Sequence, residues 1–281
     1  MNTPVGVLAF AAGLAAVFGL AFGLGRVAGP DTAPAARHES GHESSHADQP
    51  VRSAEVHLAL SGRSLAPGPD VPVSFQVQDQ DGRVVTAYDV EHEKELHLIV
   101  LDTRDLTQFQ HVHPTRAADG TWTAAVALRP GTSYRLYADG STGGEDFLAT
   151  ADLSTTGHRL APDPMPAPAT TDRVAGMTVT LDQADGTVRL AVTRDGSPVT
   201  LQPYLGALGH LVVIRVDDLS YLHVHPEQGA TPEFVVAGLA PGRYRYFFDF
   251  QVDGVVHTAA FTHDVGPSMP MGTEEHDDDS H

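Results

Sequence analysis

Histidines carry the clearest chemical signal in this 281-residue sequence, which has 16 of them and one lysine, Lys94. The tetrapeptide His-Val-His-Pro occurs at 111–114 and again at 223–226. In an extended strand, residues i and i+2 point to the same face, so both histidines of each motif should project together. A further histidine begins an apolar run upstream of each motif, at His97 and at His210. Three neutral imidazoles with an open fourth position suit Cu(II) or Zn(II).

The sequence therefore predicts two metal sites, each built from three imidazoles. Copper, as Cu2+ or Cu+, is the expected metal, and zinc is the alternative. The candidate ligands are His97, His111, His113, His210, His223 and His225. The competing interpretation is a structural network in which ring nitrogens bond backbone groups at a strand crossing. Asp105 and Asp218 also recur, either to orient an imidazole or, as we favour, to form a turn before a strand.

Other histidines and two methionines could supply auxiliary ligands. His-rich tracts are typical of metal binding, and thioethers suit Cu(I). These auxiliary candidates are His38, His42, His46, Met269, Met271 and His276. We expect His257 and His263 in core or edge packing, His57 on a strand, and His92 in a charged, exposed loop between two glutamates.

The composition excludes several other classes of function. A formal net charge of −19 argues against nucleic acid as a partner, because phosphate binding needs a basic surface. The absence of cysteine excludes disulfides, thiolate nucleophiles, cysteine zinc sites and iron–sulfur clusters. The sequence contains no Gly-x-Ser-x-Gly turn and no acid/base pair that can be singled out. We therefore do not expect an enzyme, and a copper-dependent enzyme is the second alternative.

Two β-rich segments, 55–157 and 173–266, must position these histidines. Their apolar runs at 96–101, 210–216 and 244–250 are short and rich in β-branched or aromatic residues. Asp-Gly or Pro-Gly turn signals follow one another at 81–82, 119–120, 130–131, 185–186, 195–196, 241–242 and 253–254. This pattern predicts an all-β protein with two tandem Ig-like or cupredoxin-like antiparallel β-sandwiches.

The two segments repeat each other in sequence. Matching residues keep their order while their separation falls gradually from 114 to 110, as loop insertions would produce. Two copies of one sandwich are therefore expected rather than one large fold. The matched pairs include Asp81/Asp195, His97/His210, Asp105/Asp218, His111/His223, Pro130/Pro241 and Asp139/Asp249.

An N-terminal anchor is expected within residues 1–30. Val5–Gly25 is an uncharged run of 21 residues, about 31 Å long as a helix and so close to the thickness of a bilayer core. A cleaved signal peptide, with a weak site at Ala33–Ala35, and a soluble core helix are the alternatives. Arg26 and Arg37 favour a cytoplasmic C-terminal side. We nevertheless expect a single-pass protein of the cell membrane with its globular domains outside, because long domains translocate with little regard to charge.

Three further segments are expected to lie outside the sandwiches. Residues 31–54 form a disordered, His-rich linker, since they hold few large apolar residues. Residues 158–172 form a Pro-rich, extended spacer between the two sandwiches. Residues 267–281 form a disordered acidic tail with His and Met.

The combination of motifs resembles a known family. The apolar anchor and His-rich linker are followed by YDVEHEKELHLIVL, FQHVHP, PYLGALGHLVVIRVDDLSYLHVHP and VVHTAAFTHDV. Together these are similar to an actinobacterial family of membrane-anchored, extracytoplasmic HVHP-repeat proteins associated with heavy metals. The resemblance implies an external β-sandwich protein linked to copper, and it supplies no ligand set. A looser likeness to YtkA-like or cupredoxin-like sandwiches concerns the fold, and a blue-copper site is not supported without cysteine.

The prediction for function is an extracytoplasmic, membrane-anchored protein that binds copper for storage, delivery or sensing. Its expected partners are the membrane, through residues 5–25, and a metal transporter or an envelope protein complex. The alternative is a non-metal assembly or interaction module of the envelope whose histidines are structural.

Overall fold

The computed structural model describes residues 56–159, 161–226, 229 and 231–266, and all regular elements in these ranges are β-strands. The all-β prediction is therefore confirmed for the described part. The predicted anchor at 5–25, the linker at 31–54 and the tail at 267–281 lie outside it. Within the described ranges, no helix is long and apolar enough to cross a membrane.

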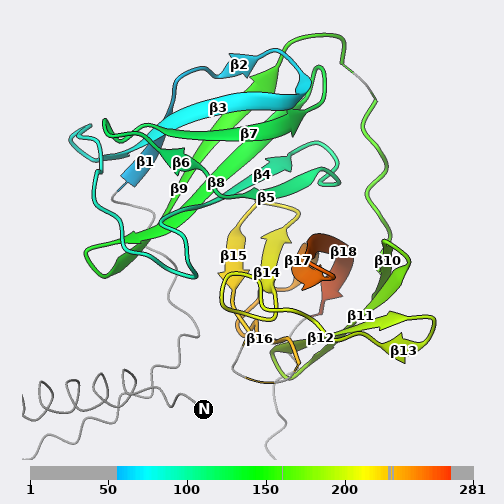
Figure 1. The fold of residues 1–281 in the computed structure, drawn as a ribbon. Coiled ribbons are helices and arrows are strands. Elements are labelled where there is room, and N and C mark those ends of the chain that lie inside the picture. The colour runs from blue at the N-terminus through cyan, green and yellow to red at the C-terminus, as the bar shows by residue number, and fades with distance from the viewer. Residues whose placement is uncertain (1–55, 160, 227–228, 230, 267–281) are drawn as a thin grey trace, which may run out of the picture. The chain divides into compact units, whose positions relative to one another are not determined.

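The first sandwich consists of two sheets around one apolar core (Figure 1). One sheet has the strand order β1-β3-β7-β6 and the other β2-β9-β8-β4-β5. Phe75 and Trp122 enter the core from the first sheet, and Leu98 and Leu136 enter it from the second. The strands are β1 (Val56–Leu60), β2 (Ser64–Leu65), β3 (Gly68–Asp79), β4 (His97–Asp102), β5 (Phe109–Val112), β6 (Thr115–Arg116), β7 (Trp122–Leu128), β8 (Ser133–Thr142) and β9 (Glu145–Thr155).

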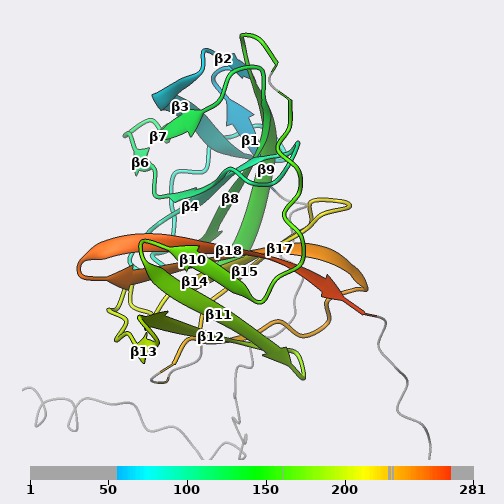
Figure 2. The ribbon, with the colours of Figure 1, turned by 90° about the vertical axis from the view of Figure 1, so that its right-hand side faces the viewer.

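The second sandwich is built in the same way. One sheet has the order β10-β11-β12-β13, with β16 also paired to β12, and the other has the order β15-β14-β17-β18. Val179 and Leu190 face Phe248 and Phe261 in its core. Figure 2 shows the long β17–β18 hairpin in orange and brown. The strands are β10 (Thr171–Val174), β11 (Met177–Ala184), β12 (Thr187–Arg194), β13 (Ser197–Pro198), β14 (His210–Arg215), β15 (Tyr221–Val224), β16 (Glu233–Val235), β17 (Gly242–Val252) and β18 (Val255–Val265).

Several predicted Asp-Gly signals form the tight turns of hairpins. Asp185 and Gly186 join β11 to β12 with φ of 51° and 76°, and Asp253 and Gly254 join β17 to β18 with 53° and 76°. Two consecutive positive φ values define the type I′ turn, whose twist matches that of the flanking strands. The turn chemistry of the sequence therefore fixes these hairpins locally.

A third apolar cluster joins residues of both sandwiches, which lie in one compact unit. Strand β4 is buried along its whole length: Leu98 points into the first core, while Ile99 points to its other face. Strand β14 behaves in the same way, with Leu211 in the second core and Val212 on the other face. The buried members of this third cluster are Ile99, Leu101, Leu106, Tyr137, Val212, Ile214 and Phe247. The continuous apolar runs in the sequence therefore reflect strands that are covered on both faces.

The Pro-rich spacer at 158–172 contacts both sandwiches. The backbone N–H of Asp163 donates to Oδ2 of Asp105 at 3.0 Å, and that of Ala169 donates to the carbonyl of Thr262 at 3.0 Å. The last two residues of the predicted spacer already belong to β10. The described part of the spacer is thus hydrogen-bonded to the two folded halves that it connects.

Candidate metal centre

The strand register turns the motif histidines toward the third apolar cluster. His111 on β5 lies opposite Ile99 on β4, and His223 on β15 lies opposite Val212 on β14. The valine between the two histidines packs against the core of its own sandwich in both motifs. Since alternate residues of a strand point to opposite faces, His111 and His223 leave each sandwich on the side of the shared cluster.

The first group of ligands is the one that the sequence predicts. His97, His111 and His113 offer nitrogen atoms that all lie within 4.8 Å of one another. Nδ1 of His97 is 3.1 Å from Nε2 of His111. Metal–nitrogen bonds of about 2.0–2.1 Å in a tetrahedral site place two ligand nitrogens roughly 3.3 Å apart. The observed separation therefore suits two ligands of one ion.

A hydrogen bond on the far side of the His111 ring fixes which of its two nitrogens is free to bind. Nδ1 of His111 donates to Oδ2 of Asp249 at 2.8 Å, because an ionised carboxylate can only accept. Nε2 of His97 faces the carbonyl of Glu91 at 3.5 Å. The contact with Asp249 leaves Nε2 of His111 as an acceptor, and Nδ1 of His97 lies within hydrogen-bond distance of it at 3.1 Å. Outer partners of this kind orient imidazole ligands in metal sites.

The second group differs from the expectation. His210 and His225 are joined by His92 from the first half of the chain, with donor atoms within 4.8 Å of one another. The rings of His92 and His225 stack with centroids 3.5 Å apart. The prediction of a charged, exposed loop for His92 is therefore wrong, because its ring is half-buried against the second sandwich.

His92 owes its position to a tight turn that both halves contain. Glu91 and Lys94 exchange two backbone hydrogen bonds, and the two residues between them have φ of 47° and 65°. Tyr204 and Ala207 close the same turn in the second half, where Leu205 has φ of 53°. Leu205 thus stands where the first half has His92.

The ring of His210 is buried among other rings and lacks hydrogen bonds. Its residue is 0% exposed, and neither ring nitrogen has a hydrogen-bond partner among the described residues. A buried polar atom without a partner costs about 1–3 kcal/mol, so a cluster of them calls for a ligand. Three further ring nitrogens are buried without a partner among the described residues: Nε2 of His113, His223 and His225.

His223 is a seventh imidazole that lies between the two groups. Its ring centroid is 5.4 Å from those of His97 and His111, and 5.9 Å and 4.5 Å from those of His210 and His225. We refer to the seven rings together as the histidine cluster; they belong to His92, His97, His111, His113, His210, His223 and His225.

Two aspartates tie the cluster across the two halves. His223 Nδ1 donates to Oδ2 of Asp139 at 2.8 Å, just as His111 does to Asp249. Each aspartate belongs to the other half of the chain, and each lies directly across the sheet from His97 or His210. The resulting pair of crossed bonds has approximate two-fold symmetry, as the repeat would generate.

Burial keeps the rings neutral. Loss of solvent, together with the neighbouring His111, lowers the pKa of His97 to about 4 and that of His113 to about 3. Burial also raises the pKa of Asp139, which neighbouring histidines partly oppose. Neutral imidazole is the form that binds metal, so the cluster is in its ligand form near neutral pH. Burial likewise lowers the pKa of His92, His210, His223 and His225.

The two turn aspartates do not touch the cluster. Oδ1 of Asp105 accepts from the backbone N–H of Thr107 at 3.0 Å, and Oδ1 of Asp218 accepts from that of Ser220 at 2.9 Å. The turn interpretation is confirmed, and the orienting carboxylates are Asp139 and Asp249 instead. Their recurrence 110 residues apart in the repeat was the available signal.

The remaining candidates lie elsewhere. His257 and His263 pack beside Phe250 and Tyr246 on the β17–β18 hairpin, as edge packing predicts, and exposed His57 contacts a glutamine on the next strand. The six auxiliary ligands, His38, His42, His46, Met269, Met271 and His276, lie outside the described residues.

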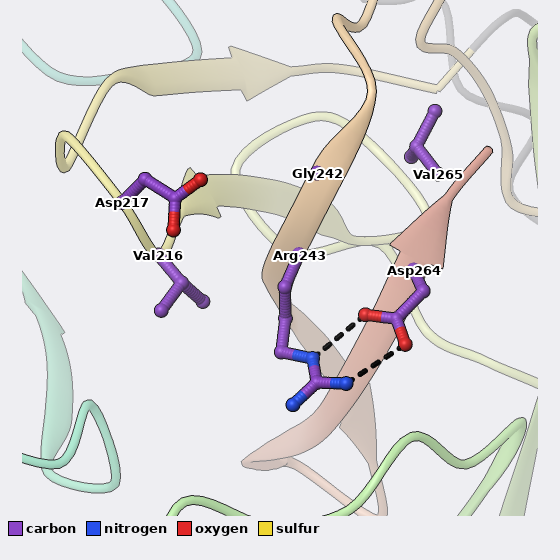
Figure 3. A pocket seen from close by; sticks show the side chains of 6 residues that line it. All are labelled: Val216, Asp217, Gly242, Arg243, Asp264 and Val265. Carbon is purple, nitrogen blue, oxygen red and sulfur yellow. Dashed lines mark hydrogen bonds and ion pairs between the residues drawn. The ribbon is translucent and has the colours of Figure 1, made fainter. Parts of the chain in front are cut away.

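A separate open pocket is occupied by an ion pair. Figure 3 shows Arg243 and Asp264 joined by two hydrogen bonds of 2.7 and 2.9 Å in this pocket. None of the described residues that line it is a histidine; they are Val216, Asp217, Gly242, Arg243, Asp264 and Val265. It is therefore no part of the candidate metal centre.

Comparisons with known proteins identify a family. Residues 50–157 and 172–266 match the model of a family described as "Domain of unknown function (DUF8832)". No curated protein matches the sequence. Among solved structures, a two fibronectin type-III domain segment from chicken tenascin shares 11% identity, with 75% of this chain and 99% of that one covered and a TM-score of 0.24.

Two further structures also align. Salmonella alpha-2-macroglobulin reacted with methylamine shares 14% identity over 77% of this chain, at a TM-score of 0.27, and only 15% of its own length is covered. The BSP domain of a biofilm associated protein shares 13% identity over 75% of this chain and 30% of its own, at a TM-score of 0.24. None of these likenesses bears on function.

Proposed function

The chain belongs to the DUF8832 family, and we propose that it binds metal ions at its histidine cluster. The description of the family assigns no function, so the proposal rests on the site itself. Copper is the expected metal, and zinc is the alternative. The protein acts in this proposal by binding, for storage, delivery or sensing of the metal, rather than by catalysis.

The observation that carries the proposal is the environment of His210. Its ring is fully buried, and both of its nitrogens lack a partner in the described part of the chain. A purely structural histidine normally finds at least one hydrogen bond. Around it stand further rings whose free nitrogens are also buried, which suits a ligand that accepts several lone pairs at once.

The donor set favours copper or zinc over harder ions. Both groups consist of imidazole nitrogens, which suit Zn and Cu, whereas Ca²⁺ and Mg²⁺ prefer oxygen ligands. The carboxylates of Asp139 and Asp249 accept hydrogen bonds from motif rings and supply negative charge beside the cluster. Buried cations need such nearby charge, because their desolvation is costly.

The proposal retains the membrane setting. Residues 5–25 would anchor the chain, with the two Ig-like or cupredoxin-like sandwiches on the extracytoplasmic side and a metal transporter or envelope complex as partner. The apolar length of that run supports this part of the proposal.

A structural module is the competing function, and the crossed His–Asp bonds favour it. They join the two halves directly, with donor–acceptor distances of 2.8 Å. In that case the cluster would hold the sandwiches together and the protein would bind a partner through another surface.

Metal analysis of residues 55–266 separates the two functions, because this range holds both cores without the His- and Met-bearing ends. We expect about two copper ions per chain after loading and gel filtration. The double variant His97→Ala/His210→Ala should bind none, while His57→Ala, which removes an exposed histidine, should bind as the parent does. A parent that binds no copper or zinc, together with a double variant that fails to fold, would support the structural function.

A further inference from the structure

We propose that the two histidine groups hold their ions side by side as one binuclear centre, with His223 as the imidazole within reach of both. This inference rests on the proposed function, since it requires metal at both groups. It goes further because two independent sites, one per sandwich, would have no reason to affect each other.

The spacing of the rings limits how far apart the two ions can lie. Metal–nitrogen bonds of about 2.0–2.1 Å place an ion roughly 3 Å from the centroid of each ring that binds it. The rings of His111 and His210, one from each group, have centroids 6.0 Å apart. The ions are therefore separated by no more than roughly 12 Å, and by less if both groups face inward.

The buried nitrogens indicate that the groups do face inward. Nε2 of His113 and Nε2 of His225, at the ends of the two motifs, are both buried without a partner within the described residues. The ring of His225 has its centroid 4.5 Å from that of His223, and the ring of His113 has its centroid 4.9 Å from that of His111. Free nitrogens that point away from each other would reach solvent or backbone groups instead.

His223 has one nitrogen to offer, and the structure directs it into the cluster. Nδ1 is held by Asp139, and Nε2 is buried without a partner among the described residues. The ring lies 5.4 Å from His97 and from His111 in the first group, and it is also near His210 in the second. Three ligands for each ion thus leave a seventh that can complete the coordination of either one.

Charge near the cluster permits two cations at this spacing. Asp139 accepts a hydrogen bond from His223, and Asp249 accepts one from His111. Each aspartate comes from the opposite half of the chain to the ring that it contacts. Two like charges in a poorly solvated site repel each other strongly, and a carboxylate at each side offsets that repulsion. One carboxylate thus lies beside His111 of the first group, and the other lies beside His223, the ring within reach of both ions.

Electron paramagnetic resonance of the full-length chain loaded with Cu(II) tests this arrangement. The variant His97→Ala/His210→Ala gives the background from copper bound outside the cluster. After subtraction we expect two copper ions per chain and a spectrum with dipolar broadening and a half-field transition. His57→Ala should give the same spectrum.

Single-group variants supply the uncoupled reference. His92→Leu gives the first half the residue that the second half carries at the same turn, so the backbone should tolerate it. His113→Ala disables the other group. Each should bind one copper ion and show the spectrum of an isolated Cu(II) ion without the half-field transition. The integrated signal should account for all of the bound copper. If circular dichroism shows that His92→Leu is unfolded, His225→Gln replaces it as the variant of the second group.

The possible results separate this inference from the proposed function. Two copper ions whose spectrum equals the sum of the single-group spectra would overturn the binuclear centre and leave metal binding intact. One copper ion in the parent, lost in either variant, would also overturn it in favour of a single shared site. No copper above the background would refute both.

Discussion

The two halves of the chain share a histidine pattern but group these histidines differently. The first half brings His97, His111 and His113 together, with two nitrogens already 3.1 Å apart. The second half contributes only His210 and His225 to its group and takes the third imidazole from the first half. A repeated sequence motif therefore does not guarantee a repeated site.

The difference comes from one side chain on one turn. Both halves place two residues with positive φ ahead of β4 or β14, yet the first position holds His92 in one half and Leu205 in the other. A non-glycine residue in this conformation is strained by roughly 1–2 kcal/mol, and both His92 and Leu205 adopt it. The interface between the sandwiches thus determines which histidines form each group. There, the turn that carries His92 in the first half reaches His210 and His225 in the second.

Replacing the first histidine of each motif, His111 or His223, should show this difference between the halves most strongly. His111→Ala should abolish one of two copper equivalents, because His111 belongs to the first group. His223→Ala should retain both, because each group keeps its three ligands. Inductively coupled plasma mass spectrometry after gel filtration measures the stoichiometry. Equal losses from the two variants would show that the halves use their motifs alike.

Acid should destabilise the metal-free protein through the buried rings. The folded-state pKa of His97 is lowered to about 4 from an unfolded value of about 6.5. Below about pH 6.5 the unfolded chain binds a proton at this ring, whereas the folded chain does not. The free energy of unfolding therefore decreases as the pH is lowered from about 6.5 to about 4, by about 3 kcal/mol for this ring. His210 is buried more completely, and its pKa is lowered too, so it should add to the loss.

Urea unfolding at pH 7.5 and pH 5 measures this effect. His97→Gln and His210→Gln should each reduce the difference between the two pH values, since glutamine does not titrate. His57→Ala should leave the difference unchanged. A parent protein whose stability is equal at both pH values would contradict neutral, buried imidazoles.

The two orienting aspartates should differ in their effect on metal affinity. Asp249→Asn loosens His111, a member of the first group, and loss of such an outer partner typically costs 10–100-fold in affinity. Asp139→Asn loosens His223, which belongs to neither group, so copper affinity should change only several-fold. Competitive titration with a chromophoric chelator measures both, and a larger effect from Asp139→Asn would reverse the assignment of the two rings.

Local patterns predicted the elements of the fold well. Asp-Gly turns, alternating strands and the gradual drift of the repeat indicate two β-sandwiches, and the register of β4 with β5 brings His97 and His111 to one face as the spacing suggested. These features depend on neighbours along the chain or one strand away, which a single sequence encodes directly.

Contacts between the halves could not be predicted in the same way. The crossed bonds of His111 to Asp249 and His223 to Asp139 join residues 138 and 84 positions apart. Their signal was indirect: strands such as 96–101 carry apolar residues at every position, which indicates burial on both faces, and the aspartates recur in the repeat. His92 lies in a turn and not on a strand, so the alternation of residues along a strand could not indicate its direction. Its position depends on the positive φ of that turn.

The turn aspartates offer the smallest and cleanest contrast between the halves. Asp105 is buried and accepts from Thr107 and from the backbone of the spacer at Asp163. Asp105→Ala leaves these donors without an acceptor and should lower the free energy of unfolding by about 1–3 kcal/mol. Asp218 is exposed and pairs with Arg215, so Asp218→Ala should cost less than about 1 kcal/mol. Both variants should still bind two copper ions, because neither aspartate touches the histidine cluster. A loss of copper in a folded Asp105→Ala protein would contradict a turn function for this residue and would extend the centre beyond the seven rings.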